Sequence, residues 1–290
     1  MQPESHLKDI IPVILAGGQG RRLRPLTSSR TPKPFLRLLS PHTFLQKTVL
    51  RVHSLNAPAL VANVAYRDRI KKDMAALGVT PSQIFLEPEG RQTAPAVAVA
   101  AHYFAATGND PLLLVMPSDH AIENPDMLLD AVRHAEPVAR QGKMVSFGVR
   151  PIRPETEYGY IRQGKQIQEG VFSVSSFIEK PDVATAKDFI QSGDCYWNSG
   201  IFLFSVSCFL AQLKQFNSVM CDQSYAAVAR ASRLQNAVFL EKEAFSSCPA
   251  ESLDRAVMEK TDSLAVMPID VGWRDLGRWP DLFRYVLRAA

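Results

Sequence analysis

The feature that most constrains the fold of this 290-residue chain is a set of five short apolar runs. They occupy residues 11–15, 59–64, 83–87, 112–116 and 144–149. Apolar and polar residues do not alternate in these runs, a pattern typical of parallel strands that are buried on both faces. Stretches with helical spacing separate them, at residues 44–55, 66–78, 93–108 and 126–142. Strand and helix in alternation predict a doubly wound α/β sheet of the Rossmann-like kind.

Helix ends and the second half of the chain complete the predicted layout. Thr43 is expected to cap the helix at 44–55, and Pro137 should kink or split the helix at 126–142. Beyond residue 150 the pattern changes to extended segments around glycine turns, which predict an inserted β lobe at about 150–205. Helical spacing resumes at 183–193 and 207–220, and the chain closes with a strand, a loop and a helix. We expect residues 1–290 to form a single domain, because no linker or repeat marks a boundary.

Charge and cysteine content exclude several classes of protein. Lysine and arginine total 33 and acidic residues 29, a net charge of +4 that is too mild to indicate nucleic-acid or membrane-surface binding. No apolar run approaches the roughly 20 residues that span a bilayer. The four cysteines lack zinc-ligand spacing and are too few for a disulfide framework. Reduced thiols in a cytoplasmic protein are therefore expected.

A glycine-rich, strongly basic segment follows the first strand. Leu15 and Ala16 end the apolar run, and Gly17, Gly18 and Gly20 follow. Glycines let backbone N–H groups approach a phosphate, and ligands of open α/β sheets bind beyond the carboxyl ends of the strands. The segment lacks the Gly-Lys-Ser/Thr of a P-loop, and its glycine spacing differs from the dinucleotide fingerprint. A solvated basic turn is the alternative.

Two aspartates lie where a metal site could form. Asp119 follows the apolar run at 112–116, and Asp275 lies in the segment VGWRDLGRW. Mg²⁺ is usually held by one or two carboxylates together with phosphate oxygens. Each aspartate could instead cap a helix. Glu179 and Lys180 are adjacent, so in an extended strand they would point to opposite faces, and a surface ion pair is the alternative for Lys180.

Taken together, the motifs resemble those of sugar-1-phosphate nucleotidylyltransferases. LAGGQGRRLRPLTSSRTPKPF is similar to the family signature G-G-x-G-x-R-L-x-P-L-T/S followed by K-P. EPEGRQTAPA, from residue 87, resembles the E-P-x-x-R-N-T-A-P-A segment typical of mannose-1-phosphate guanylyltransferases. Further similar segments follow in family order: MPSDH, ETEYGYI, FIEKP, YWNSGIFLF, ESLDRAVMEK and GWRDLGRW. The resemblance covers essentially the whole chain.

The resemblance implies a nucleotide-diphospho-sugar transferase fold and a reaction in which a sugar 1-phosphate attacks a nucleoside triphosphate, releasing pyrophosphate. It implies catalytic roles for Arg22 and Lys33, and Mg²⁺ held by Asp119 and Asp275. Sugar-phosphate binding is implied for Gly159, Glu179, Lys180 and Asn198. Nucleotide binding is implied for Leu15, Ala16, Gly17, Gly18, Gly20, Arg22, Gln92, Thr93 and Asp119.

The expected substrates are GTP and mannose 1-phosphate, which would give GDP-mannose. The sequence differs from the motifs typical of guanylyltransferases at five positions: Arg21, Arg24, Gln92, Glu157 and Arg274. The same reaction with UTP or dTTP, or with a glucose- or heptose-type sugar, is therefore the alternative. A non-catalytic regulator that binds a nucleotide-sugar is another. The resemblance leaves a homodimer open, and we expect no β-helix or isomerase domain after the catalytic one.

Overall fold

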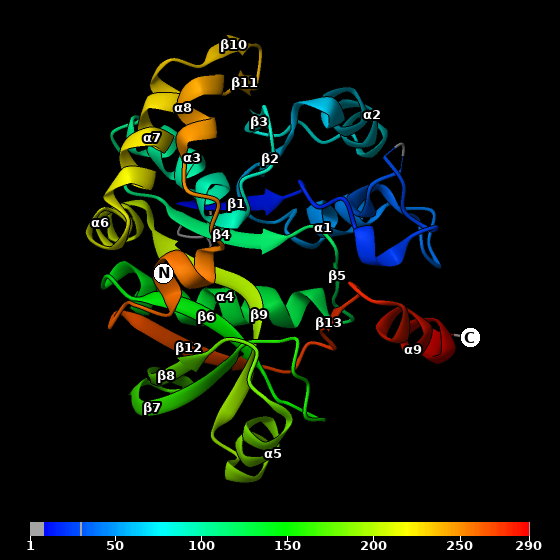
Figure 1. The fold of residues 1–290 in the computed structure, drawn as a ribbon, viewed down its shortest axis with the longest axis vertical. Helices are drawn as coiled ribbons and strands as arrows, with labels where there is room; N and C mark the ends of the chain where they lie inside the picture. Colours follow the sequence, from blue (N-terminus) through cyan, green and yellow to red (C-terminus); the bar gives the residue numbers. More distant parts are fainter. Residues whose placement is uncertain (1–8, 30, 290) are drawn as a thin grey trace, which may run out of the picture.

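The computed structural model describes residues 9–29 and 31–289 (Figure 1). The longer helices are α1 (Phe44–Arg51), α2 (Arg67–Leu77), α3 (Thr93–Ala105), α4 (Pro125–Arg140), α5 (Val183–Ser192), α6 (Val206–Phe216), α7 (Ser218–Ala229), α8 (Lys242–Ser247) and α9 (Trp279–Ala289). The strands are β1 (Ile10–Leu15), β2 (Ala59–Asn63), β3 (Gln83–Glu87), β4 (Leu112–Pro117), β5 (His120–Ala121), β6 (Met144–Val149), β7 (Tyr160–Gln168), β8 (Val171–Ile178), β9 (Cys195–Ser205), β10 (Ser232–Leu234), β11 (Ala237–Phe239), β12 (Leu264–Ile269) and β13 (Arg274–Asp275). Short 3₁₀ turns span η2 (Arg21–Leu23), η3 (Lys33–Phe35) and η4 (Val64–Tyr66), and a π turn spans η5 (Asp254–Met258).

Eleven strands form one mixed sheet in the order β10-β11-β3-β2-β1-β4-β9-β6-β12-β8-β7. Strand β1 pairs in parallel with β2 and β4, whereas β9 runs antiparallel to β4 and β6. The chain passes from one side of β1 to the other between β3 and β4. Such a switch opens a crevice at the carboxyl ends of the two strands it separates, here β1 and β4. The predicted doubly wound α/β sheet is confirmed.

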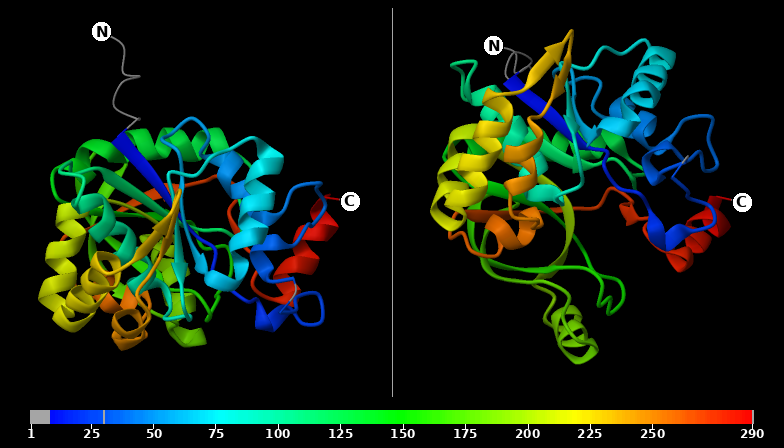
Figure 2. Two further views of the ribbon diagram at one scale, coloured as in Figure 1. Left: turned by 90° about the horizontal axis from the view of Figure 1, so that it is seen from above. Right: turned by 45° about the horizontal axis from the view of Figure 1, so that its top comes forward.

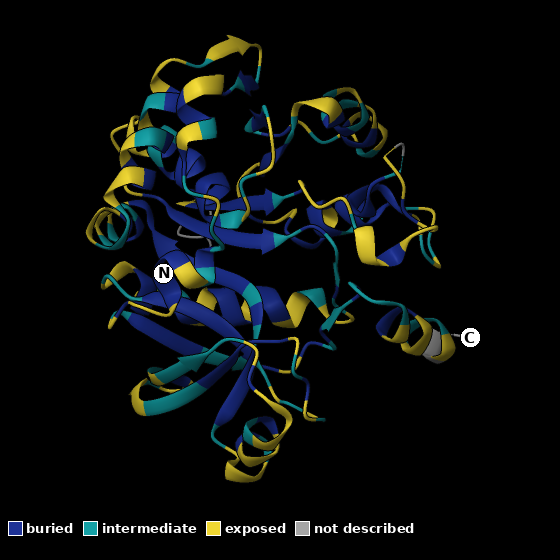
Figure 3. Cartoon of the chain, in the orientation of Figure 1, coloured by how far each residue is buried: buried dark blue, intermediate teal, exposed yellow. Residues whose placement is uncertain are grey.

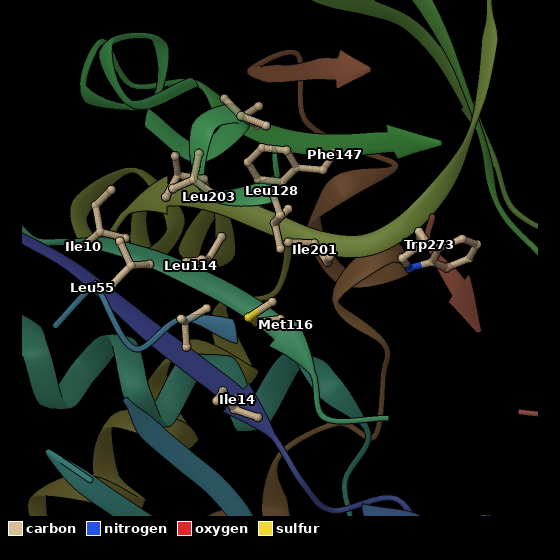
Figure 4. Close-up of a cluster of buried hydrophobic side chains, with 14 of the residues drawn as sticks. Ile10, Ile14, Leu55, Leu114, Met116, Leu128, Phe147, Ile201, Leu203 and Trp273 are labelled. Carbon is tan, nitrogen blue, oxygen red and sulfur yellow. The ribbon is translucent and has the colours of Figure 1, made fainter. Parts of the chain in front are cut away.

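Alternate residues of the central strands enter two different cores. Ile10 and Ile14 of β1 pack in a cluster with residues of α1, α2 and α4 (Figure 4). Ile11 and Val13 face the opposite side, where alanine-rich α3 packs together with α6 and α7. Helices accordingly cover both faces of the central sheet (Figure 2), and its strands are buried except at their ends (Figure 3). Burial on both faces explains why these strands are predominantly apolar.

The predicted β lobe is continuous with the central sheet. Strand β7 pairs with β8 and also with the beginning of β9, so that β9, β6, β12, β8 and β7 close into a ring. Ile161, Tyr196 and Val266 fill its small apolar core. Gly148 allows this packing, because a Cβ there would lie 2.7 Å from Tyr196 Cβ and 2.8 Å from Val266 Cγ2.

Most predicted helix ends agree with the structure. Thr43 caps α1 in a capping box with Gln46. Of the two outcomes predicted for Pro137, the split is wrong, because α4 continues through it to Arg140, where buried Val138 and Ala139 hold the last turn in place. The helical stretch predicted at 207–220 is two helices that meet at residue 217. Among the described residues, none of the helices combines the length and apolar character that a bilayer span requires.

Candidate active site

The glycine segment is folded tightly over η3. The N–H of Ala16 donates to Val61 O at 2.8 Å, which fixes the exit of β1. Gly20 has φ 68°, and a Cβ there would lie 2.7 Å from Lys33 Cβ. Thr27 Oγ1 donates to Gly20 O at 2.7 Å. The segment therefore needs glycine at position 20, both for the backbone angle and for the approach of Lys33.

Lys33 occupies the centre of the site. Its side chain is 4 % exposed, and its Nζ lies 2.7 Å from Asp119 Oδ2 and 3.5 Å from Asp275 Oδ1. Burial opposes the charged ammonium, but the two carboxylates outweigh it and raise the pKa of Lys33. Burial likewise opposes ionisation of Asp119, yet Lys33 holds the pKa of this carboxyl below its usual range. Lys33 and Asp119 are therefore both charged at neutral pH.

A two-stranded pairing brings the aspartates together. Asp119 follows β4, and Asp275 lies on β13, which pairs with β5 so that Asp275 is opposite His120. His120 Nε2 is 3.8 Å from Asp275 Oδ1, and its Nδ1 accepts a hydrogen bond from Trp273 Nε1 at 3.1 Å. Burial lowers the pKa of His120, which favours the neutral ring. The two segments, far apart in sequence, meet between the sheet and α9 (Figure 1).

A pocket opens beside the glycine segment. Its lining residues are Leu15, Gly17, Gly18, Val61, Glu87, Gly90, Arg91, Gln92, Thr93, Ala96, Pro117 and Asp119. Most of the residues for which nucleotide binding was predicted thus lie around one cavity. The pocket lies at the carboxyl ends of β1, β3 and β4, where the fold places ligands.

Glu87 is a site residue that the sequence did not single out. Its side chain is buried at the end of β3, and Oε1 has no hydrogen-bond partner within the described part of the chain. A Cβ on Gly17 would lie 3.3 Å from Glu87 Oε2, so the carboxyl lies against the glycine segment. Burial raises the pKa of Glu87 to about 8. A buried carboxyl with a free oxygen, lining a cavity, is arranged for a ligand that donates hydrogen bonds.

Gln92 and Thr93 line the same pocket through different groups. Gln92 has φ 62°, an unusual angle for a residue with a side chain, and its Nε2 donates to Ala250 O at 2.9 Å. Thr93 Oγ1 accepts a hydrogen bond from Leu253 N at 2.8 Å. Both side chains are thus positioned by residues 250–253, while Gln92 Oε1 and the Thr93 hydroxyl hydrogen are not used in these two bonds.

Arg22 lies apart from the Lys33 cluster. Its side chain is 67 % exposed on η2, and its nearest acidic partner is Glu157 Oε2, 3.5 Å from NH1. Glu157 belongs to the loop that leads into β7. Contact between Arg22 and a bound triphosphate therefore requires its side chain to leave this surface ion pair, which costs little.

The residues predicted for the sugar phosphate gather at the ring of strands. A Cβ on Gly159 would lie 2.8 Å from Glu179 Oε2, and Asn198 N donates to Gly159 O at 2.8 Å. Strand β8 ends at Ile178 and Lys180 adopts φ 49°, so the chain turns and Lys180 Nζ meets Glu179 Oε1 at 3.0 Å. Glu179 and Lys180 lie beyond the end of β8, so the alternation of an extended strand, which would place their side chains on opposite faces, does not apply to them.

Asp254 is a second residue that the sequence did not single out. Asn198 Nδ2 donates to its Oδ1 at 2.6 Å. Burial, reinforced by the nearby charge of Glu179, raises the pKa of Asp254 to about 6. A sugar-side cluster thus consists of Gly159, Glu179, Lys180, Asn198 and Asp254.

The profile of the "Nucleotidyl transferase" family matches residues 11–289. The chain belongs to the nucleotidyl transferase family. It is 46% identical over 278 residues to "Xanthan biosynthesis protein XanB" of Xanthomonas campestris pv. campestris, which covers 95% of this chain and 59% of that protein. It is 42% identical over 283 residues to "Mannose-1-phosphate guanylyltransferase" of Salmonella muenchen, covering 96% of this chain and 59% of the relative. The chain therefore spans about three fifths of the length of these relatives.

A solved structure shares the fold of this nucleotidyl transferase. The "mannose-1-phosphate geranyltransferase" of Thermus thermophilus superposes with a TM-score of 0.83 at 31% sequence identity, covering 93% of this chain and 77% of the other. The structure of a UDP-glucose pyrophosphorylase complexed with UDP-glucose has a TM-score of 0.62 at 13% identity, a likeness in fold alone.

Nucleotidyl transferases generally use a divalent metal, and the residues present fit one. Asp119 and Asp275 both lie within 3.5 Å of Lys33 Nζ, so two carboxylates face the same point. Two carboxylates are a typical protein contribution to a hard cation whose other ligands are phosphate oxygens and water. Among the described residues, no group of three or more histidine, cysteine or acidic side chains offers a closed metal cage.

Proposed function

We propose that this chain transfers GMP from GTP to mannose 1-phosphate, forming GDP-mannose and pyrophosphate. A phosphate oxygen of the sugar 1-phosphate attacks the α-phosphorus, and the bond from that phosphorus to the oxygen bridging to the β-phosphorus breaks. Support for the sugar comes from relatives such as the mannose-1-phosphate guanylyltransferase of Salmonella muenchen, 42% identical. Support for guanine as the base comes from a buried carboxyl group in the nucleotide pocket.

The observation that carries the choice of guanine is Glu87. A carboxylate accepts two hydrogen bonds side by side, and guanine offers two adjacent donors, its N1–H and its 2-amino group. Uracil and thymine offer one ring N–H on the corresponding edge and flank it with carbonyl oxygens, which a carboxylate repels. Glu87 lines the pocket with an unpaired Oε1, so guanine would satisfy an atom that is otherwise buried without a partner.

The sugar 1-phosphate and the nucleoside triphosphate are both anions and repel each other. Positively charged lysine and arginine side chains are therefore expected to contribute most to catalysis. Lys33, held between Asp119 and Asp275, is placed to draw the attacking phosphate toward the α-phosphorus. Arg22, once released from Glu157, would neutralise charge on the departing pyrophosphate. Mg²⁺ held by the two aspartates would supply Lewis-acid stabilisation of the triphosphate.

The sugar 1-phosphate would occupy the ring of strands. Lys180, 47 % exposed, would bind its phosphate. Glu179 would accept hydrogen bonds from sugar hydroxyls, and Asn198 would donate one to a sugar hydroxyl. Gly159 keeps this surface close to the ligand, because a side chain there would collide with Glu179. All four cysteines are free, which fits the reducing cytoplasm as the compartment.

The test is pyrophosphate release with a panel of nucleoside triphosphates and sugar 1-phosphates. We expect GTP with mannose 1-phosphate to give the highest kcat/KM, and Glu87→Gln to reduce the preference for GTP over UTP about tenfold or more. Equal turnover of UTP or dTTP would refute the guanine assignment. Nucleotide-sugar binding without any turnover would favour the non-catalytic regulator.

A further inference from the structure

Residues 250–254 connect the nucleotide pocket to the sugar side of the site. Three hydrogen bonds of 2.8 to 3.1 Å tie residues 250–253 to residues 92–94, the turn that starts α3 and lines the pocket. The next residue, Asp254, bonds to Asn198 on β9. One short segment therefore contacts both halves of the site.

The contact between Asp254 and Asn198 fixes the orientation of the asparagine amide. Asn198 Nδ2 donates to Asp254 Oδ1 at 2.6 Å, while Asn198 Oδ1 accepts from Gly200 N at 3.0 Å. One Nδ2 hydrogen remains for a ligand. Removal of the Asp254 carboxylate would leave the amide held from one side only.

The backbone at Asp254 is built for this contact. It begins the π turn η5, in which Glu259 N donates to Asp254 O at 2.8 Å. π turns are rare and are frequently found at functional sites. Ala256, Val257 and Met258 are buried behind the turn and anchor it. The turn therefore presents Asp254 from a rigid base.

We propose that Asp254 is a positioning and specificity residue for the sugar 1-phosphate, orienting Asn198 and accepting, together with Glu179, hydrogen bonds from two neighbouring sugar hydroxyls. Both carboxyl groups lie beside Asn198 and Gly159: Asp254 accepts from Asn198 Nδ2, Asn198 N donates to Gly159 O, and a Cβ on Gly159 would lie 2.8 Å from Glu179 Oε2. Carboxylates accept hydrogen bonds, and a pair of hydroxyls supplies the donors. The charges of Glu179 and Glu259 both act on this side of the site. The ligand class is a sugar phosphate with two adjacent hydroxyls. The inference rests on the function proposed above.

The test compares Asp254→Ala and Asp254→Asn with the matched control Asp262→Asn. The control changes an exposed aspartate that follows η5 in the chain. Initial rates are measured with GTP and either mannose 1-phosphate or analogues lacking one ring hydroxyl. Asp254→Ala should raise the KM for mannose 1-phosphate roughly ten- to a hundredfold, and change that for GTP less than about twofold. Its preference for mannose 1-phosphate over the deoxy analogues should shrink by a similar factor.

Asp254→Asn provides the conservative comparison. It keeps an oxygen that can accept from Asn198 Nδ2 at unchanged volume, so its KM for the sugar should lie between those of wild type and Asp254→Ala. If Asp254→Ala does not fold, the test rests on Asp254→Asn. This variant should then show a smaller preference for mannose 1-phosphate over the deoxy analogues, while its melting temperature equals that of the wild type. An equal rise of both KM values, or an unchanged deoxy preference, would overturn the assignment.

Failure of the proposed function gives a different result. If the wild type prefers another base or sugar, the guanylyl proposal fails, and the same variants measured with the preferred pair still decide the role of Asp254. If the wild type turns nothing over, calorimetric titration with mannose 1-phosphate decides. Binding that Asp254→Ala loses and Asp262→Asn keeps supports the role, and absence of binding to the wild type overturns it.

Discussion

The two halves of the site use lysine in opposite ways. On the nucleotide side, Lys33 is 4 % exposed and fixed between two carboxylates on a tightly packed turn. On the sugar side, Lys180 is 47 % exposed and forms a single ion pair, with its sequence neighbour Glu179. The first cation is pre-organised by the fold, whereas the second remains free to reach a ligand. The difference predicts that damage to the first affects stability and chemistry, and damage to the second affects binding alone.

Lys33→Met should have the largest effect. It leaves Asp119 and Asp275 facing each other without a cation, and because these carboxylates are 23 % and 32 % exposed, the cost should lie below that of a fully buried pair, about 3 to 5 kcal/mol. We expect turnover to fall on the order of a thousandfold or more and the free energy of unfolding to drop in metal-free buffer. Mg²⁺ should restore part of the stability but not the turnover, as measured by urea denaturation and pyrophosphate release. Full stability of the metal-free variant would contradict the buried pairing.

Gly20→Ala tests how the nucleotide side is packed. The substitution combines a φ of 68° with a Cβ 2.7 Å from Lys33 Cβ, so we expect a loss of about 2 kcal/mol of unfolding free energy or more. Gly78→Ala is the matched control, because Gly78 has φ 66° but open space around it, and it should lose only about 1 kcal/mol. Equal losses in thermal denaturation would show that the contact with Lys33 is unimportant.

Lys180→Ala should leave the free energy of unfolding within about 0.5 kcal/mol of the wild type, because the side chain is half-exposed. Its KM for the sugar 1-phosphate should rise on the order of tenfold, with that for the triphosphate unchanged. Steady-state kinetics with each substrate varied in turn provide the measurement. Parallel rises in both KM values would place Lys180 outside the sugar site.

The smallest effect is expected from pH. Burial raises the pKa of Glu87 from 4.5 to about 8, so most of the empty protein holds this carboxyl protonated at pH 7. In the function proposed above, guanine donates its hydrogen bonds to the carboxylate form of Glu87, so the KM for GTP should fall several-fold between pH 7 and 9. Because the folded pKa lies above the unfolded value, the stability this group contributes is fully present below the unfolded pKa and is lost as pH rises through the folded one. Both dependences should vanish in Glu87→Gln.

The sequence predicts the nucleotide side better than the sugar side, for a physical reason. The five apolar runs match β1, β2, β3, β4 and β6 within one residue at each end, because burial on both faces leaves a purely local signal. The cluster of Lys33, Asp119 and Asp275 follows from strand ends and motifs. On the sugar side, the sequence predicts extended segments within about 150–205 but not the bounds of β7 and β8, because many positions of these strands are partly exposed. Beside β3, the elements β10, β11 and α8 were not predicted either, since short elements carry little periodicity.

The functional residues that the sequence did not single out depend on distant contacts. Asp254 meets Asn198 only because a π turn places it there, and a π turn leaves no recognisable pattern in sequence. Glu87 lies within the quoted EPEGRQTAPA motif, but its unpaired oxygen is visible only in three dimensions. Its position as a carboxylate ending a buried apolar strand was the available signal.

Ring closure in the β lobe also bears on how the protein behaves at high concentration. Strand β7 (Tyr160–Gln168) pairs with β8, and its residues 160–162 also pair with β9, so the open rim of backbone donors and acceptors at this end of the large sheet is confined to the part of β7 beyond Arg162. The opposite end is β10, three residues long and carrying Arg233. Exposed rims recruit strands from other molecules, and short charged ones do so poorly. The eleven-stranded sheet thus offers little edge for edge-to-edge aggregation: a short charged strand at one end, and a partly covered strand at the other.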